Sequence, residues 1–347
     1  MTSIWTTGAK ALLIPAAAAL LLGSPARAAD PHYQLEAEIK MPGVKIVWDY
    51  LAFDTVNRKL YINRRANGVF VYSPDDNKML GLIEKSEGSN GVALAYDVNR
   101  GYSSNDNGTS TVFDLKTQKT IDTVKDGDDN DANVYDPFSK KIIWINADAG
   151  TATFGNAADG KILGKAPLNS KKPEFPAVDG KGKLFVNIQD KSELAVFDTN
   201  TMKELARWPT APCQLPTALV MDPTTNRLFL GCRSDKPVLA VMDAASGKVV
   251  ASLPIGRGTD AAAFDPETKK IFVTGGLDAK LTIIQQKSAD EYAIVEEVAT
   301  RAQARTIAID PKTKKVFTVT AAFGPPGPDG RQQARPDSFA LLIYAPK

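Results

Sequence analysis

The sequence predicts an all-β fold, a seven-bladed β-propeller with four strands in each blade. Three observations predict it. One hairpin pattern recurs seven times, the repeats are spaced 39 to 45 residues apart, and the last repeat lacks a strand that the N-terminal segment resembles. A period of about 40–45 residues is typical of propeller blades, whereas ankyrin and tetratricopeptide units are about 33 or 34 residues long.

Each repeat centres on an aspartate that follows an apolar residue and opens a polar turn, as in FDPETKKIFV at Phe264–Val273. An Asp side chain accepts hydrogen bonds from the backbone two residues on, and Pro presets φ at the next position. A small or apolar run before the turn suits an inner strand, and a β-rich run after it suits a second strand. The seven turn aspartates are Asp54, Asp97, Asp136, Asp179, Asp222, Asp265 and Asp310.

Each unit continues with a third strand such as VLAVMD, and a second turn then leads to a fourth strand such as VVASLPI. After Asp310 the sequence offers strands only at KVFTVTA and FALLIYA. The segment Tyr33–Gly43 resembles the fourth strands and precedes the first repeat. We therefore expect the N-terminal strand to complete the last blade and close the ring, which leaves only short, protected sheet edges.

The N-terminal region has the pattern of a secretory signal peptide. An apolar run, Ala11–Leu22, follows Lys10 and leads to the small-x-small sequence Ala26–Ala28. Twelve apolar residues are too few to span a bilayer, so we expect residues 1–28 to be removed on export to the periplasm. Residues 29–347 then form one propeller domain, because each unit of a closed array buries its face only against its neighbours.

The charge balance argues against a nucleic-acid partner. Removal of residues 1–28 would leave 40 basic and 40 acidic residues, a formally neutral protein. Nucleic-acid binding is driven by a concentrated basic surface that displaces counterions. A small molecule or an envelope protein or peptide is the expected partner, and a monomer is the expected state.

Two cysteines, Cys213 and Cys232, lie nine residues before and ten residues after the turn at Asp222. Folding of that hairpin brings them near each other, and an oxidising compartment lets them pair. We expect a structural disulfide. The alternative is two separate buried thiols.

Several phrases of the sequence resemble the bacterial YVTN-repeat, or YncE-like, propeller family. The resemblance extends from about Tyr33 to the C-terminus and rests on WDYLAFD, GVALAYD, KPEFPAVDGKGKLFVN, LFLGCRSDK and ARTIAID, among others. It implies a periplasmic seven-bladed propeller, structurally akin to the β-chain propellers of quinoprotein amine dehydrogenases. It implies no settled activity, although one branch of the family has been associated with DNA binding.

The sequence departs from the family pattern at one position. Where relatives usually have His-Gly before VALA, this sequence has Asn90-Gly91. If that histidine binds a metal or ligand in relatives, the site is altered here.

The first residues of the inner strands are expected at one mouth of the central channel. Counting back five residues from each turn aspartate gives Asp49, Val92, Asp131, Glu174, Thr217, Asp260 and Arg305, of which four are acidic. Trp48 and Tyr50 are candidates for an aromatic wall at this mouth, although such aromatics as often pack between blades.

Converging carboxylates repel one another unless a cation, a shared proton or an arginine offsets them. One interpretation is a site for a hard cation such as Ca²⁺, or for another ligand, formed by Asp49, Asp131, Glu174 and Asp260, with Arg305 holding an acidic group. The other is that each acid accepts backbone N–H bonds from the next inter-blade loop and locks neighbouring blades together.

Loops between second and third strands are expected to open on the same face. They carry Arg64, Arg65 and Arg233, and they include the long segment 321–338. That segment contains too much Pro and Gly for a strand or helix, and it is interpreted either as a lid or as an unordered loop.

Several enzyme classes are excluded by composition. His32 is the only histidine, which argues against a catalytic Ser-His-Asp or Cys-His arrangement at the mouth. There is no Cys-x-x-Cys-His for covalent haem, no His-rich zinc set and no GxxxxGK[ST] phosphate loop.

Three functions remain open. The first is a binding or scaffold protein that holds a small ligand or peptide at the channel mouth, with no catalysis assumed. The second is a cation-dependent hydrolase, lactonase or lyase in which one acid acts as general base. The third is single-stranded DNA binding beside aromatics through Arg64, Arg65, Arg233, Arg305 and Arg331.

Overall fold

The computed structural model describes residues 1–4, 32–41, 43, 45–127, 129–327 and 332–347. The chain divides into two compact units, Met1–Asp30 and Pro31–Lys347. The expected signal peptide lies almost wholly outside the described residues and stays a prediction. Among the described residues, no helix is long and apolar enough to cross a membrane.

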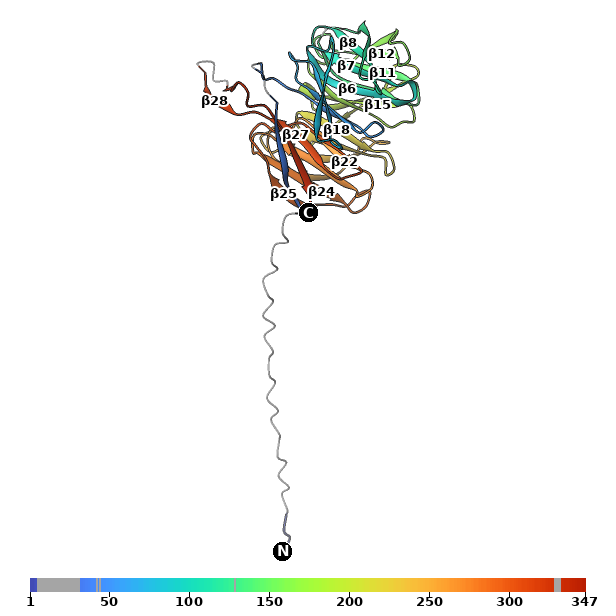
Figure 1. Ribbon diagram of the computed structural model, residues 1–347. Coiled ribbons are helices and arrows are strands. Elements are labelled where there is room, and N and C mark those ends of the chain that lie inside the picture. The colour runs from blue at the N-terminus through green and yellow to red at the C-terminus, as the bar shows by residue number, and fades with distance from the viewer. Residues whose placement is uncertain (5–31, 42, 44, 128, 328–331) are drawn as a thin grey trace. The chain divides into compact units, whose positions relative to one another are not determined.

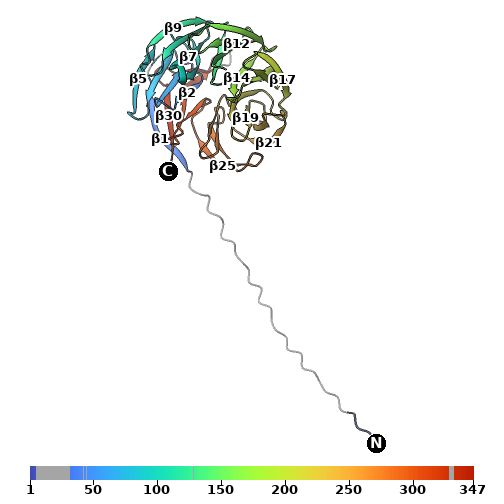
Figure 2. The same ribbon diagram turned by 90° about the vertical axis from the view of Figure 1, so that its right-hand side faces the viewer.

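The unit Pro31–Lys347 contains seven four-stranded antiparallel sheets arranged as a ring of blades (Figure 1, Figure 2). Blade 1 comprises β2 (Leu51–Asp54), β3 (Lys59–Asn63), β4 (Val69–Ser73) and β5 (Lys78–Ile83). Blade 2 comprises β6 (Ser89–Ala95), β7 (Arg100–Asn105), β8 (Thr109–Asp114) and β9 (Thr120–Lys125). Blade 3 comprises β10 (Asn130–Asp136), β11 (Lys141–Asn146), β12 (Thr151–Asn156) and β13 (Ile162–Pro167).

The remaining blades repeat this arrangement. Blade 4 comprises β14 (Pro173–Val178), β15 (Lys183–Ile188), β16 (Glu193–Asp198) and β17 (Lys203–Pro209). Blade 5 comprises β18 (Pro216–Asp222), β19 (Arg227–Cys232), β20 (Val238–Asp243) and β21 (Val249–Pro254). Blade 6 comprises β22 (Ala262–Asp265), β23 (Lys270–Gly275), β24 (Lys280–Gln286) and β25 (Tyr292–Ala299). Blade 7 comprises β26 (Ile307–Ile309), β27 (Val316–Thr320), β30 (Ala340–Pro346) and β1 (Tyr33–Lys40). Two short 3-10 turns also occur: Tyr96–Val98 directly follows β6, and Gln189–Lys191 directly follows β15.

The N-terminal strand closes the ring, as the sequence predicts. Strand β1 pairs antiparallel with β30, from Tyr33 opposite Pro346 to Lys40 opposite Ala340. Strand β26 then contacts β2 of the first blade, as each inner strand contacts the next one around the ring. The predicted seven-bladed fold with its closing strand is therefore confirmed.

Burial follows from the position of each strand in its blade. Second and third strands lie between neighbouring blades, so they are buried on both faces, as in β27 (all five residues buried). Fourth strands form the outer edge and are largely exposed, as in β5. This explains why second and third strands are almost continuously apolar while fourth strands carry many polar residues.

The turn aspartates organise one face of the ring, here called the turn face. Asp54 Oδ1 accepts hydrogen bonds from the backbone N–H groups of Val56 and Asn57, at 2.9 and 2.8 Å. Asp310 likewise accepts from the N–H of Lys312 at 3.0 Å. The predicted turn chemistry is thus present, and it fixes the link between first and second strands.

A cation four residues after the turn aspartate connects neighbouring blades. In blades 1, 3, 6 and 7 this residue has positive φ, between 54° and 62°, and its side chain reaches the turn aspartate of the preceding blade. The pairs are Arg58 with Asp310 at 2.6 Å, Lys140 with Asp97 at 2.6 Å, Lys269 with Asp222 at 3.7 Å and Lys314 with Asp265 at 3.1 Å. The repeated hairpin therefore specifies an inter-blade contact as well as a turn.

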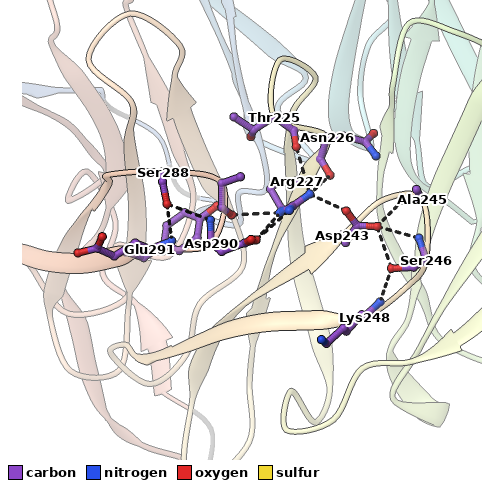
Figure 3. A network of polar contacts seen from close by, with 12 residues as sticks. Thr225, Asn226, Arg227, Asp243, Ala245, Ser246, Lys248, Ser288, Asp290 and Glu291 are labelled. Atoms are coloured by element: carbon purple, nitrogen blue, oxygen red, sulfur yellow. Dashed lines mark hydrogen bonds and ion pairs between the residues drawn. The ribbon is translucent and has the colours of Figure 1, made fainter.

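Blade 5 uses a different cation for the same purpose (Figure 3). Arg227 donates to Asp243 of its own blade at 2.6 Å and to Asp290 of blade 6 at 2.8 Å. Its Nε also donates to the carbonyl of Ala289 at 3.0 Å. Charges on the turn face are thus largely neutralised within the protein.

Two further expectations concern local structure. The expected disulfide between Cys213 and Cys232 is present, with Cα atoms 5.4 Å apart. The expectation that segment 321–338 has no strand is wrong, because β28 (Phe323–Pro326) pairs with β29 (Gln332–Ala334). Pairing between the two ends of the segment outweighs its unfavourable Pro and Gly content.

Candidate functional site at the channel mouth

The predicted acids belong to the face opposite the turn aspartates, here called the mouth face. First strands begin there and second strands end there, because each first strand ends at its turn aspartate on the other face. Asp131 and Glu174 lie at the starts of β10 and β14, and Asp49 and Asp260 lie just before β2 and β22. Four different blades therefore supply one carboxylate each.

Tyr50 crosses the channel beneath this mouth. Its ring belongs to blade 1, yet it packs edge-on against Phe175 of blade 4, with centroids 4.6 Å apart. Its hydroxyl donates to Glu174 Oε2 at 3.5 Å, and the side chain is 4% exposed. Tyr50 is therefore a packed residue that connects the inner strands of blades 1 and 4 beside the carboxylates.

The carboxylates lie close enough to raise one another's pKa. Burial, followed by repulsion from Asp131 and Asp260, raises the pKa of Asp49 well above its ordinary value, against the opposing charges of Arg305 and Arg65. Burial and repulsion from Asp131 and Asp260 also raise the pKa of Glu174. The predicted convergence is thus reflected in the electrostatics of the mouth.

Asp131 is the least compensated member of the group. Burial and repulsion from Asp129 and Asp260 raise its pKa to about 6. Among the described residues it has no hydrogen bond and no ion pair within 4.0 Å. The Asp49 carboxylate is also weakly compensated, because its ion pair among the described residues is a long one, with Arg65 at 3.8 Å.

Asp260 has two arginine partners. Arg233 Nη1 donates to Asp260 Oδ1 at 2.8 Å, and Arg305 Nε donates to Oδ2. Arg305 also donates to the carbonyl of Trp48 at 2.8 Å and lies 5.0 Å from the Trp48 ring centroid. Arg305 is thus bound within the protein, where the sequence interpretation assigned it to an acidic ligand group.

Backbone locking does not describe these acids. None of the hydrogen bonds to the four carboxylates in the described structure comes from a backbone N–H. Glu174 Oε1 instead accepts from Gln189 Nε2 at 2.8 Å, and Gln189 also donates to Thr217 at 2.7 Å. In the described structure, Asp260 links blades through arginine side chains, and Glu174 links blade 4 to blade 1 through the Tyr50 hydroxyl.

Buried amides around the mouth present unpaired acceptors. The side-chain nitrogen of Asn90 donates to the carbonyl of Asn130 at 3.0 Å, and that of Asn133 donates to the carbonyl of Tyr102 at 2.8 Å. The side-chain oxygens of Asn90, Asn130, Asn133 and Asn187 are buried and have no hydrogen-bond partner in the described structure. Asn133 Oδ1 and the Tyr50 ring approach the same point on Gly91, so this acceptor lies near the Tyr50 ring.

Two predicted mouth residues have other roles. Arg64 is buried, and its guanidinium lies between the rings of Phe70 and Phe339, 4.9 and 4.6 Å from their centroids. It lines a cavity of about 390 Å³ with Met41, Met79 and the outer strand β5. Trp48 is also buried, and it packs on Phe323 and Phe339.

The structure gives no support to a metal cluster. Within the described part of the chain, no group of three or more His, Cys, Asp or Glu side chains is placed to hold a metal ion. The carboxylates are therefore near enough to interact electrostatically but are not gathered around a common point.

Sequence reasoning missed the residues that give the mouth its shape. Phe175 packs against the Tyr50 ring, and Gln189 donates a hydrogen bond to Glu174. Asn133 adds a buried acceptor. Asn133 lies two residues after Asp131, which is a signal that a search for polar residues along inner strands would detect. The contact of Tyr50 with Phe175 spans 125 positions and has no local signal.

These features define a β-propeller with a polar, acidic site at one channel mouth. No family model and no curated protein matches the chain. Among solved structures, a chain of a mitotic checkpoint complex is similar at TM-score 0.73 and 16% identity, covering 95% of this chain and 99% of that one. A chain of Kuenenia stuttgartiensis hydrazine synthase is similar at TM-score 0.69 and 14% identity, covering 80% and 94%.

The WD40 repeats of RRP9 are similar at TM-score 0.73 and 8% identity, covering 90% of this chain and 99% of that one. Identities this low establish the propeller fold alone. They assign no family and no activity.

Proposed function

We propose that this protein is an exported, periplasmic binding or scaffold propeller that holds a ligand at its channel mouth. The YVTN-type resemblance and the N-terminal pattern support export. The proposal assumes no catalysis. A ring of blades that presents polar side chains at one channel mouth is a sufficient frame for binding.

One observation carries the proposal: a carboxylate at the mouth, that of Asp131, has no bonded partner among the described residues. Asp131 has no bonded partner in the described structure, and the pKa of Asp49, Asp131 and Glu174 is raised. Several charges on the turn face are instead paired across blades. Unsatisfied buried charge costs stability, and such sites are concentrated where a protein binds something.

Ligand-observed NMR tests the proposal. The mature protein is mixed with pools of small metabolites and short peptides, and saturation transfer identifies the compounds that bind. Asp131→Asn should abolish transfer to at least one compound, because the substitution removes a mouth charge without breaking a bonded contact. Asp290→Asn is the matched control, since that aspartate is 66% exposed on the turn face (Figure 3).

The proposal fails if every binding compound is retained by Asp131→Asn, or if none binds. The alternative functions receive less support from the geometry. A cation-dependent hydrolase needs a metal cluster, and single-stranded DNA binding needs free arginines, whereas Arg233 and Arg305 are both paired with Asp260.

A further inference from the structure

We infer that the ligand of this mouth is an organic cation, a primary amine or a lysine-like ammonium group, held chiefly by Asp131. The inference rests on the proposed function and adds the chemical class of the ligand. It is carried by two observations: the Asp131 carboxylate without a bonded partner in the described structure, and the side-chain oxygens of Asn130 and Asn133, which flank it on β10 and have no donor there.

The first step concerns charge. The arginines at the mouth are engaged: Arg233 and Arg305 bind Asp260, and Arg65 is shared between Asp49 and Asp106 at 3.8 and 3.3 Å. An anionic ligand would have to displace one of these carboxylates. A cationic ligand meets Asp131 with no bond to break, and it offsets the repulsion among its neighbours.

The second step concerns hydrogen bonds. Asn90, Asn130, Asn133 and Asn187 each use their side-chain nitrogen, and each leaves a buried oxygen without a donor. Their orientation is fixed, because an exchanged amide would place oxygen against an oxygen acceptor. A ligand group that reaches Asn130 or Asn133 beside Asp131 has to donate hydrogen bonds, and an ammonium group offers three N–H donors and no acceptor.

The third step separates an ammonium from a metal ion. Ca²⁺ takes six to eight oxygens around one point, and no group of three acids is so placed among the described residues. An ammonium accepts fewer and less regularly placed oxygens.

Isothermal titration calorimetry with 1,4-diaminobutane at low ionic strength and pH 7.5 tests the inference. We expect the diamine to bind the mature protein and the neutral isostere 1,4-butanediol not to bind. Asp131→Asn should weaken diamine binding about 10- to 100-fold, the range expected on losing a hydrogen bond to a charged group. Asp290→Asn, on the turn face, should leave it unchanged.

Each other outcome overturns the inference. If the diol or succinate bound and this binding depended on Asp131, the mouth would still be a binding site. Its ligand would then not be an organic cation. Binding of Ca²⁺ that excludes the diamine would make the site a metal site. Equal diamine affinity in wild type and Asp131→Asn would mean adventitious surface binding, and the NMR screen decides separately whether the mouth binds anything.

Discussion

Replacement of Arg58 with alanine should destabilise the protein far more than the equivalent change in another blade. Arg58 connects blade 1 to blade 7, donating to Asp310 from Nη1 at 2.9 Å and from Nη2 at 2.6 Å. The Asp310 side chain is 0% exposed and that of Arg58 is 15% exposed. Removal of one partner of a buried pair costs about 3–5 kcal/mol, because it leaves a buried charge uncompensated.

Asp310 retains donors from the Lys312 N–H and the Thr313 hydroxyl, so we expect a loss of about 2–4 kcal/mol for Arg58→Ala. Lys140→Ala is the matched control, because Lys140 occupies the same position in blade 3, with φ of 58° against 54°. Its pair with Asp97 is exposed, at 60% and 38%, and should contribute at most about 1 kcal/mol.

Urea unfolding monitored by tryptophan fluorescence measures both variants against wild type. A loss for Arg58→Ala at least 1 kcal/mol larger than for Lys140→Ala is expected. Equal losses would refute the reasoning that burial, rather than the ion pair itself, sets the size of the effect.

Three further predictions concern stability. Burial raises the pKa of Asp126 to about 7, so the folded state keeps a proton that the unfolded state has released between about pH 4 and 7. The free energy of unfolding of the wild type then falls as pH rises through that window. Relative to wild type, the free energy of unfolding of Asp126→Asn should therefore be about 2–4 kcal/mol more favourable at pH 8 than at pH 4. A difference between the two proteins that does not change with pH in urea unfolding would contradict this. Substitution of both Cys213 and Cys232 by Ser should cost about 3 kcal/mol in urea unfolding, because the bond closes a loop of 19 residues; no change would contradict this. Gly101→Ala would place its methyl 2.2 Å from the Phe113 ring and should lower the unfolding free energy by about 1–3 kcal/mol, whereas a neutral result would show that the ring can move away.

The fold was predictable because its information is local and repeated. A turn at Asp265 follows from its own six residues, and the same pattern recurs at a propeller period. The closing strand was predictable because only Tyr33–Gly43 could supply the strand that the last repeat lacks. The cations after the turns, such as Lys314, repeat equally well and were detectable by the same reasoning.

The site was only partly predictable, because its shape depends on contacts across the ring. The offset from the turn aspartates located Asp131 and Glu174, but it said nothing about the crossing of Tyr50. Arg64 is a second example. Its loop position was predictable, whereas its contact with Phe339, 275 residues away, has no local signal.

The carboxyl titration of Asp131 tests the central claim most directly. In protein labelled with ¹³C at aspartate carboxyls, assigned with Asp131→Asn, the resonance should titrate with a pKa of about 6, because the group is buried, is repelled by Asp129 and Asp260, and lacks a bonded cation. Addition of 1,4-diaminobutane should lower that pKa, since a bound cation favours the charged form. An ordinary aspartate pKa that the diamine leaves unchanged would contradict an uncompensated, ligand-binding mouth.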